Sequence, residues 1–368
     1  MLDSVTKIQK RARTKQEFSW AIFSRPEDLN WNCVVGEEHP VIDGISKSDN
    51  HVLSNQTGFF YQPFLNSMPC MMIQGVAKCL DSVALSGQII ELTQNVYELS
   101  DLDELTSTTE DVFRTEIARI KQEIELGKLV KVVAARSKWH ALNSINGETL
   151  SAVLTELKSQ YPSTFIFLIH TKEQGCWIGA SPEQLLTIKK SQANVMALAG
   201  TLTNDQRSWS DKEMEEQTVT HDFIGGVLRQ FGLAADESKL REVDLGKVKH
   251  LLREWKFAID YYRWFELVQQ MHPTPAVAGF PQQESVDWLI NHEPLDRKLY
   301  SGWLGYSDAV NQELDIYVAL RCGELFSSGI KIYAGCGVNL GSDFRTEWKE
   351  TEMKMQMISE AILRYLHV

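Results

Sequence analysis

The sequence predicts an α+β protein in which β-sheets form the centre and helices lie outside them. Segments with strand-like and helix-like patterns are mixed along the chain, without the one-to-one alternation of a doubly wound parallel fold. The chain has 368 residues, of which 43% are hydrophobic and 23% are charged. It is therefore long enough to bury a large core and has the composition of a soluble globular protein.

The helices are predicted from apolar residues at helical spacing and from capping signals. Thr109 can cap the first helix and Gly127 suits its end. Between these two, apolar residues recur every three or four positions, at Val112, Phe113, Ile117, Ile120 and Ile124. We also expect a helix that opens at Ser210 or Asp211 and runs towards Gly232, and helices at 261–271, 283–291 and 344–365.

The strands are predicted from short apolar, β-branched runs. The first of the clear ones runs from Leu129 to Ser137, and others lie at 164–169, 176–180, 195–199, 248–252, 314–322 and 330–334. Before about residue 100, short apolar runs alternate with Gly, Pro and Asn and carry no chemical motif. We therefore expect an N-terminal part, 1–105, and a catalytic part, 106–368, within one compact domain.

Charge and cysteine content restrict the partners and the compartment. The net charge of −12 argues against nucleic acid or an anionic membrane surface as a general partner. The six cysteines have no CxxC spacing, and residues 1–15 lack the apolar core of a secretory signal. No apolar run approaches the roughly 18–20 residues of a membrane span. We expect a cytoplasmic protein with reduced thiols.

A glycine-rich turn precedes the C-terminal helix. Gly335 and Gly337 would let the strand turn tightly or approach a bound group closely. In the helix, Glu347, Glu350 and Lys354 are three and four residues apart and share one face. An exposed Glu350–Lys354 ion pair would explain the spacing. Alternatively, the carboxylates hold a hard cation while the glycines and the lysine receive an anion.

Two residues at strands could act as a base and an acid. Lys131 shares the apolar face of its strand with Val133, so it either snorkels at an edge or is buried. Burial disfavours the charged form of lysine, and the neutral amine could then act as a base. Pro182 places Glu183 at a strand end, where catalytic groups often lie. The alternative is that Glu183 opens a helix that begins at Pro182.

Acidic residues crowd the start of the helix at Asp211. The simple explanation is that the helix dipole favours acidic residues near the helix N-terminus, here Glu213, Glu215 and Glu216. Glu216 lies deeper, however, and like charges repel unless a cation intervenes. A pair of Glu216 and Glu350 from two helices would suit Mg²⁺.

Further residues could bind an anionic substrate. Backbone amides at Gly200 and Thr201 could cradle a carboxylate, and Arg321, at the end of an apolar strand, could grip one bidentately. His250 could bond a substrate oxygen, although a lone histidine is more often structural. The segment 272–281, HPTPAVAGFP, has the rigid and apolar character of a pocket wall.

The order and spacing of these motifs resemble the chorismate-utilising enzyme family from roughly residue 108 to the C-terminus. The resemblance rests on Lys131-Val132-Val133, Ser181-Pro182-Glu183, Leu198-Ala199-Gly200-Thr201, the helix with Glu216, His250-Leu251, HPTPAVAGFP, Leu320-Arg321, Ala334-Gly335-Cys336-Gly337 and the stretch from Glu347 to Lys354. It implies stacked, mainly antiparallel sheets flanked by helices, with the site between the sheets. Lysine rather than glutamine at position 131 goes with water as the nucleophile, and HPTPAVAGFP resembles the isochorismate synthase version of that segment.

The resemblance also implies a reaction. Neutral Lys131 would take a proton from water, which attacks C2 of chorismate, and protonated Glu183 would donate to the departing C4 hydroxyl. Mg²⁺ would be held by Glu216 and Glu350, with Glu347 near or in the same shell. The substrate-binding set would comprise Gly200, Thr201, His250, Arg321, Gly335 and Lys354. The expected partner is therefore a small molecule, chorismate, bound by a monomer without nucleic acid, membrane or obligatory protein partner.

Two departures and two alternatives accompany this hypothesis. Cys336 stands where alanine is usual, and Arg253 stands where many members have threonine.

A salicylate synthase would go on to eliminate pyruvate from isochorismate in the same pocket. A non-catalytic chorismate- and metal-binding paralogue is the other alternative, against which the intact acid and base argue. Isochorismate feeds menaquinone, catechol siderophores and salicylate, and the lack of a visible fused segment favours menaquinone.

Overall fold

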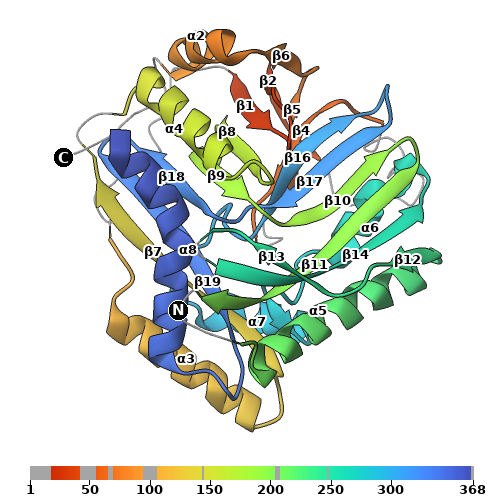
Figure 1. Ribbon diagram of the computed structural model, residues 1–368, viewed down its shortest axis with the longest axis vertical. Coiled ribbons are helices and arrows are strands. Elements are labelled where there is room, and N and C mark those ends of the chain that lie inside the picture. The colour runs from red at the N-terminus through yellow and green to blue at the C-terminus, as the bar shows by residue number, and fades with distance from the viewer. Residues whose placement is uncertain are drawn as a thin grey trace, which may run out of the picture.

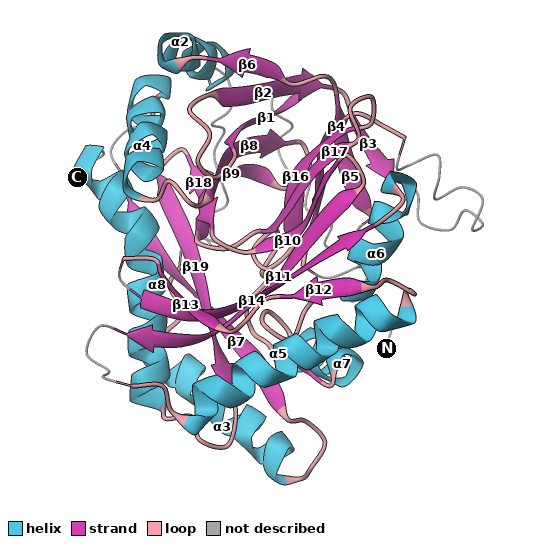
Figure 2. Ribbon diagram, turned by 45° about the vertical axis from the view of Figure 1, so that its right-hand side comes forward, coloured by secondary structure: helices cyan, strands magenta, loops and turns pink. Residues whose placement is uncertain are grey.

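Two large β-sheets form the centre of the protein, and helices surround them (Figures 1 and 2). The computed structural model describes residues 18–41, 55–64, 69–93, 106–142, 145–203, 208–246 and 248–365. Adjacent strands within these ranges pair antiparallel wherever their register is defined, as between β1 (Ser19–Ser24) and β8 (Phe165–Thr171). The α+β prediction with stacked antiparallel sheets is confirmed.

The first sheet has nine strands in the order β15-β7-β19-β18-β9-β8-β1-β2-β6. Besides β1 and β8 these are β2 (Trp31–Gly36), β6 (Lys78–Leu80), β7 (Lys131–Ala141), β9 (Gly175–Ser181), β15 (Gly279–Phe280), β18 (Cys322–Phe326) and β19 (Gly329–Val338). Its outer face is covered by α2 (Ser82–Thr93), α4 (Gly147–Gln160) and α8 (Phe344–Tyr365). Against its β7 end pack α3 (Glu110–Glu125) and α7 (Gln282–His292).

The second sheet has ten strands, in the order β12-β14-β11-β10-β17-β16-β4-β5-β3 with β13 paired to β14. They are β3 (Glu38–Val41), β4 (Gly58–Gln62), β5 (Cys70–Gln74), β10 (Gln184–Lys189), β11 (Gln192–Thr203), β12 (Ala235–Glu237), β13 (Arg241–Asp244), β14 (Val248–Ala258), β16 (Trp303–Asp308) and β17 (Glu313–Val318). The helices α5 (Asp211–Gln230) and α6 (Trp264–Met271) lie on its outer face, with the 3₁₀ turn η2 (Tyr261–Arg263) before α6.

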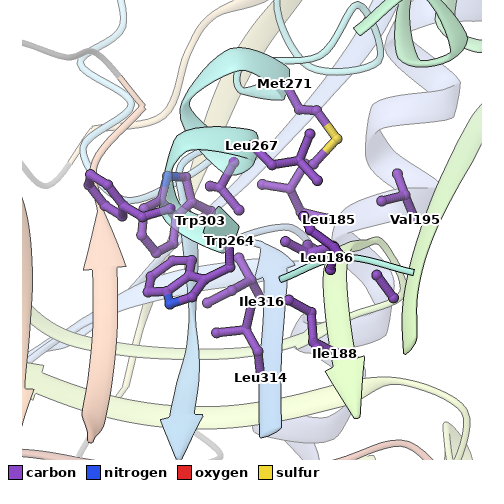
Figure 3. Close-up of a cluster of buried hydrophobic side chains, with 14 of the residues drawn as sticks. Leu185, Leu186, Ile188, Val195, Trp264, Leu267, Met271, Trp303, Leu314 and Ile316 are labelled. Carbon is purple, nitrogen blue, oxygen red and sulfur yellow. The ribbon is translucent and has the colours of Figure 1, made fainter. Parts of the chain in front are cut away.

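Alternating side chains of the strands build cores on both faces of each sheet. In β1, Trp20 and Ile22 pack in the core beneath the helices, whereas Ala21 and Phe23 pack in the core between the sheets. On the outer face of the second sheet, Trp264 and its neighbours on α6 pack against Leu186 and other strand residues (Figure 3). The described part of the chain contains no helix long and apolar enough to cross a membrane.

Most of the predicted elements are present, and some bounds differ. Thr109 caps α3 by accepting a hydrogen bond from Val112 N, as predicted. The predicted single strand 314–322 is wrong, because β17 ends at Val318 and β18 begins at Cys322 in the other sheet. Residues 261–263 form a 3₁₀ turn rather than the first turn of a helix. The N-terminal strands join both sheets, and the division at 105/106 stays a prediction.

Two of the connections through which the chain passes from one sheet to the other lie next to each other. Pro182 and Glu183 link β9 to β10, and residues 319–321 link β17 to β18. The two connections bond each other, since Val318 N donates to Glu183 O and Ala180 N donates to Arg321 O, both at 3.0 Å. Predicted site residues therefore lie where the two sheets meet.

Candidate active site

A pocket opens where the two sheets meet, and most of the predicted site residues line it. These are Lys131, Glu183, Gly200, Thr201, Glu216, His250, Arg321, Gly335 and Lys354. The other two, Glu347 and Glu350, are buried beside them on α8. Ala276 and Val277 line the pocket from the predicted wall segment. Sequence patterns missed Tyr300 and Ser301, which carry no charge or motif that would single them out.

Lys131 is a buried lysine that projects from an interior strand. It is only 3% exposed, and β7 lies between β15 and β19, so the edge-lysine alternative is wrong. Its Nζ lies 3.4 Å from Glu216 Oε2. Gly337 on β19 makes room for both side chains, because a Cβ there would lie 2.6 Å from Lys131 Cε and 2.8 Å from Glu216 Cδ.

Glu183 lies in the connection between β9 and β10, so the alternative of a helix that begins at Pro182 is wrong. Its carboxyl group is buried at the pocket wall. Burial raises the pKa of Glu183 to about 8, although the charges of Lys131 and Lys354 offset part of the effect. The group is therefore mostly protonated at neutral pH and can donate a proton into the pocket.

The acidic residues at the start of α5 have separate roles. Glu213 accepts a hydrogen bond from Ser210 N at 2.9 Å and caps the helix, and Glu215 accepts one from Asn339 Nδ2 at 2.8 Å. Glu216, one turn further along, is the member that reaches the pocket. Dipole compensation and capping thus explain Glu213. They do not explain Glu216, which is therefore the candidate for a role in the pocket.

The carboxylates of α8 meet basic side chains. Lys354 Nζ lies 2.6 Å from Glu350 Oε1, and Lys212 Nζ on α5 lies 2.7 Å from Glu347 Oε1. Burial would raise the pKa of Glu350, but Lys354 and Lys212 outweigh it and lower the pKa to about 2. For Glu347, burial raises the pKa to about 7 despite the opposing charge of Lys212. The predicted Glu350–Lys354 pair is present and is buried rather than exposed.

The donor chemistry of Glu216, Glu347 and Glu350 fits a hard divalent cation. Glu347 is fully buried, and its Oε2 has no hydrogen-bond partner among the described residues. Within the described ranges, however, no group of three His, Cys, Asp or Glu side chains is arranged closely enough to hold a metal ion in this conformation. The ammonium group of Lys212 instead contacts both Glu347 and Glu216, the second at 3.4 Å from Oε1.

His250 and Arg321 form a chain of hydrogen bonds at the pocket. Gly200 has a φ of +74° at a register shift in β11, and its carbonyl accepts a bond from His250 Nδ1 at 2.9 Å. His250 Nε2 lies 3.0 Å from Arg321 Nη2 and must be the acceptor, since arginine only donates. Burial and the charge of Arg321 together lower the pKa of His250 to about 3, so the ring is neutral. In this arrangement His250 positions Arg321.

Gly335 and Lys354 present polar groups to the same pocket. Lys354 Nζ donates to Gly335 O at 2.9 Å. Ala135, the strand partner of Gly335, donates its N–H to Glu293 Oε1 at 3.2 Å rather than across the β7–β19 ladder. Ala135 and Gly335 therefore form a non-hydrogen-bonded pair, in which the N–H of Gly335 points away from β7.

Comparison with known proteins identifies relatives of this arrangement. A family model described as a chorismate binding enzyme matches residues 75–363. The isochorismate synthase MenF of Haemophilus influenzae is 31% identical over 245 residues, which cover 63% of this chain and 56% of that protein. The salicylate biosynthesis isochorismate synthase of Pseudomonas aeruginosa is 30% identical over 254 residues, or 65% of this chain and 52% of that protein. The chain thus spans about half the length of the curated relatives it matches.

A solved structure shows the same fold. The menaquinone-specific isochorismate synthase MenF from Escherichia coli superposes with a TM-score of 0.71 at 20% identity. The match covers 95% of this chain and 90% of that structure.

Proposed function

Since this chain belongs to the chorismate-binding enzyme family, we propose that it is an isochorismate synthase. The main support is that a buried lysine and a buried carboxyl group, whose pKa burial raises to about 8, line one pocket together with a buried arginine. A base and an acid in one pocket suit a reaction that adds a nucleophile and expels a hydroxyl group. The names of the two curated relatives support the same activity.

In the proposed reaction Lys131, in its uncharged form, accepts a proton from a water molecule that attacks C2 of chorismate. Glu183 donates its proton to the C4 hydroxyl, which leaves as water while the ring double bonds shift. One water enters and one leaves, so the product is an isomer. Arg321, held by His250, and the amide of Gly335 bind the carboxylates of the dianionic substrate.

We further propose Mg²⁺ as the cofactor, held by Glu216 and Glu350 with Glu347 near or in the same shell. When bound, the ion would neutralise and orient a substrate carboxylate at the reacting ring. The enzyme is proposed to act as a cytoplasmic monomer. Its product is proposed to supply menaquinone formation. The Haemophilus relative shares the name MenF with the Escherichia coli enzyme that is described as menaquinone-specific, which supports this part of the proposal.

Incubation with chorismate and Mg²⁺, followed by chromatographic separation of the products, tests the proposal. We expect isochorismate in equilibrium with chorismate, and no product when EDTA is present. Salicylate together with pyruvate would instead identify a salicylate synthase. Binding of chorismate without turnover would contradict the proposal and indicate a non-catalytic relative.

A further inference from the structure

Lys212 has a position that its own helix does not favour. It is the second residue of α5, where the positive end of the helix dipole disfavours a cation. Its side chain is nevertheless only 12% exposed, with Nζ 2.7 Å from Glu347 Oε1 and 3.4 Å from Glu216 Oε1. Its two carboxylate partners come from different helices, α5 and α8, and they account for its buried position.

The carboxylates of the candidate metal site are paired with lysines in the structure. A lysine Nζ lies within ion-pair distance of each of them, in the pairs Lys131–Glu216, Lys212–Glu216, Lys212–Glu347 and Lys354–Glu350. Within the described ranges, Lys212 is the basic side chain that reaches Glu347. Three carboxylates thus face three lysines.

We propose that Lys212 is an internal counter-ion that occupies the cation position between Glu216 and Glu347 and withdraws when a divalent cation binds. The inference rests on the proposed Mg²⁺ dependence. An ammonium group and Mg²⁺ cannot both lie against the same carboxylate oxygens without strong repulsion. The flexible four-carbon stem of lysine allows its ammonium group to move away without a backbone change. Lys212 therefore lowers the affinity of the substrate-free protein for Mg²⁺.

Calorimetric titration of the metal-free full chain with Mg²⁺ alone tests this role. We expect Lys212→Met to bind Mg²⁺ at least about tenfold more tightly than the wild type, because a competing charge beside the ligand oxygens is gone. In EDTA the same variant should melt at a lower temperature than the wild type, and Mg²⁺ should raise its melting temperature more. Lys212→Arg keeps the charge and should keep the weak affinity.

Lys298→Met is the matched control, since Lys298 is also 12% exposed and its Nζ lies 2.8 Å from a buried carboxylate, Glu324. Its Mg²⁺ affinity should equal that of the wild type. An unchanged or weaker affinity in Lys212→Met, or an equal gain in Lys298→Met, would overturn the proposal. The activity of the wild type separates this failure from that of the proposed function. If the wild type needs Mg²⁺ for turnover but Lys212→Met binds Mg²⁺ with unchanged affinity, only the counter-ion role is contradicted. If the wild type turns over chorismate in EDTA, the metal dependence itself is contradicted.

Discussion

Lys131 is buried in an interior strand, so its amine meets a water molecule only inside the pocket. A general base typically contributes about 10²–10⁴-fold to a rate. We expect Lys131→Ala to lower kcat by about that factor while chorismate still binds, as measured by steady-state kinetics and calorimetry. Lys138→Ala, on the same strand but paired with Glu352 outside the pocket, is the control and should retain activity. Full activity in Lys131→Ala would show that another group removes the proton.

Because Glu183 must be protonated to act as the acid, we expect the reaction to slow as the pH rises. Burial raises its pKa to about 8, so the proton that it must donate is present below this pH and is lost above it. We expect kcat/KM for chorismate, which reports the free enzyme, to fall as the pH rises through about 8. Glu183→Gln, which cannot donate the proton, should be nearly inactive at all pH values. A kcat/KM that stays constant up to pH 9 would contradict the assignment.

At the scale of elements, Gly337 on β19 leaves space for the side chain of Glu216 from α5. A methyl group on Gly337 would overlap both Lys131 and Glu216, so Gly337→Ala must displace the base and a candidate metal ligand together. A displacement of about 1 Å can cost about 10²-fold in rate. We expect a loss of that order in kcat/KM, with little change in the far-ultraviolet circular dichroism.

Gly341→Ala is the control for this substitution, because a Cβ at Gly341 would make only ordinary contacts, the nearest at 3.4 Å from Asn339 Oδ1. It should retain activity. If Gly337→Ala is as active as Gly341→Ala, the side chains of Lys131 and Glu216 tolerate displacement and the proposed geometry is wrong.

Sequence patterns predicted the elements that carry strong local signals. The capped helix α3 and the strands around Lys131 and Glu183 are of this kind. The run 314–322 was predicted as one strand because it is mostly apolar and contains no Gly or Pro. The break comes from Arg321, a non-glycine residue with a φ of +47°, and its contacts with His250 and with β9 are made only in the folded chain.

Lys212 illustrates the limit of predicting the candidate site from sequence. The predicted residues were recognised by the motifs around them, whereas Lys212 looks like a solvated lysine on a charged helix. Its partner Glu347 is far away in the sequence, and no local pattern connects them. A signal was present nonetheless, since a lysine in the first turn of a helix opposes the dipole.

At the scale of the whole molecule, the N-terminal strands are part of both sheets. In the first sheet β1 pairs with β8, and in the second β4 pairs with β16. Without them, β8 and β16 would become exposed edges, and the core between the sheets would lose Ala21, Phe23, Val34, Phe59, Tyr61, Met71 and Ile73.

We therefore expect a fragment of residues 106–368 not to fold as a soluble monomer, although it contains every predicted site residue. Size-exclusion chromatography and thermal melting of the fragment, beside the full chain, test this. A monomeric fragment with a cooperative transition would show that residues 1–105 are dispensable for folding and would favour two independent units.

The paired connections between the sheets also restrict how the length of the chain can vary. One inserted residue advances an extended strand by about 3.3 Å and turns the following side chains to the opposite face. An insertion between β9 and β10 would therefore carry Glu183 out of the pocket. One between β17 and β18 would do the same to Arg321, and either would break the hydrogen bonds that join the two connections. The hairpin between β16 and β17, where Val310 is 87% exposed, has no such partner in the pocket and is a place where extra residues can be accommodated.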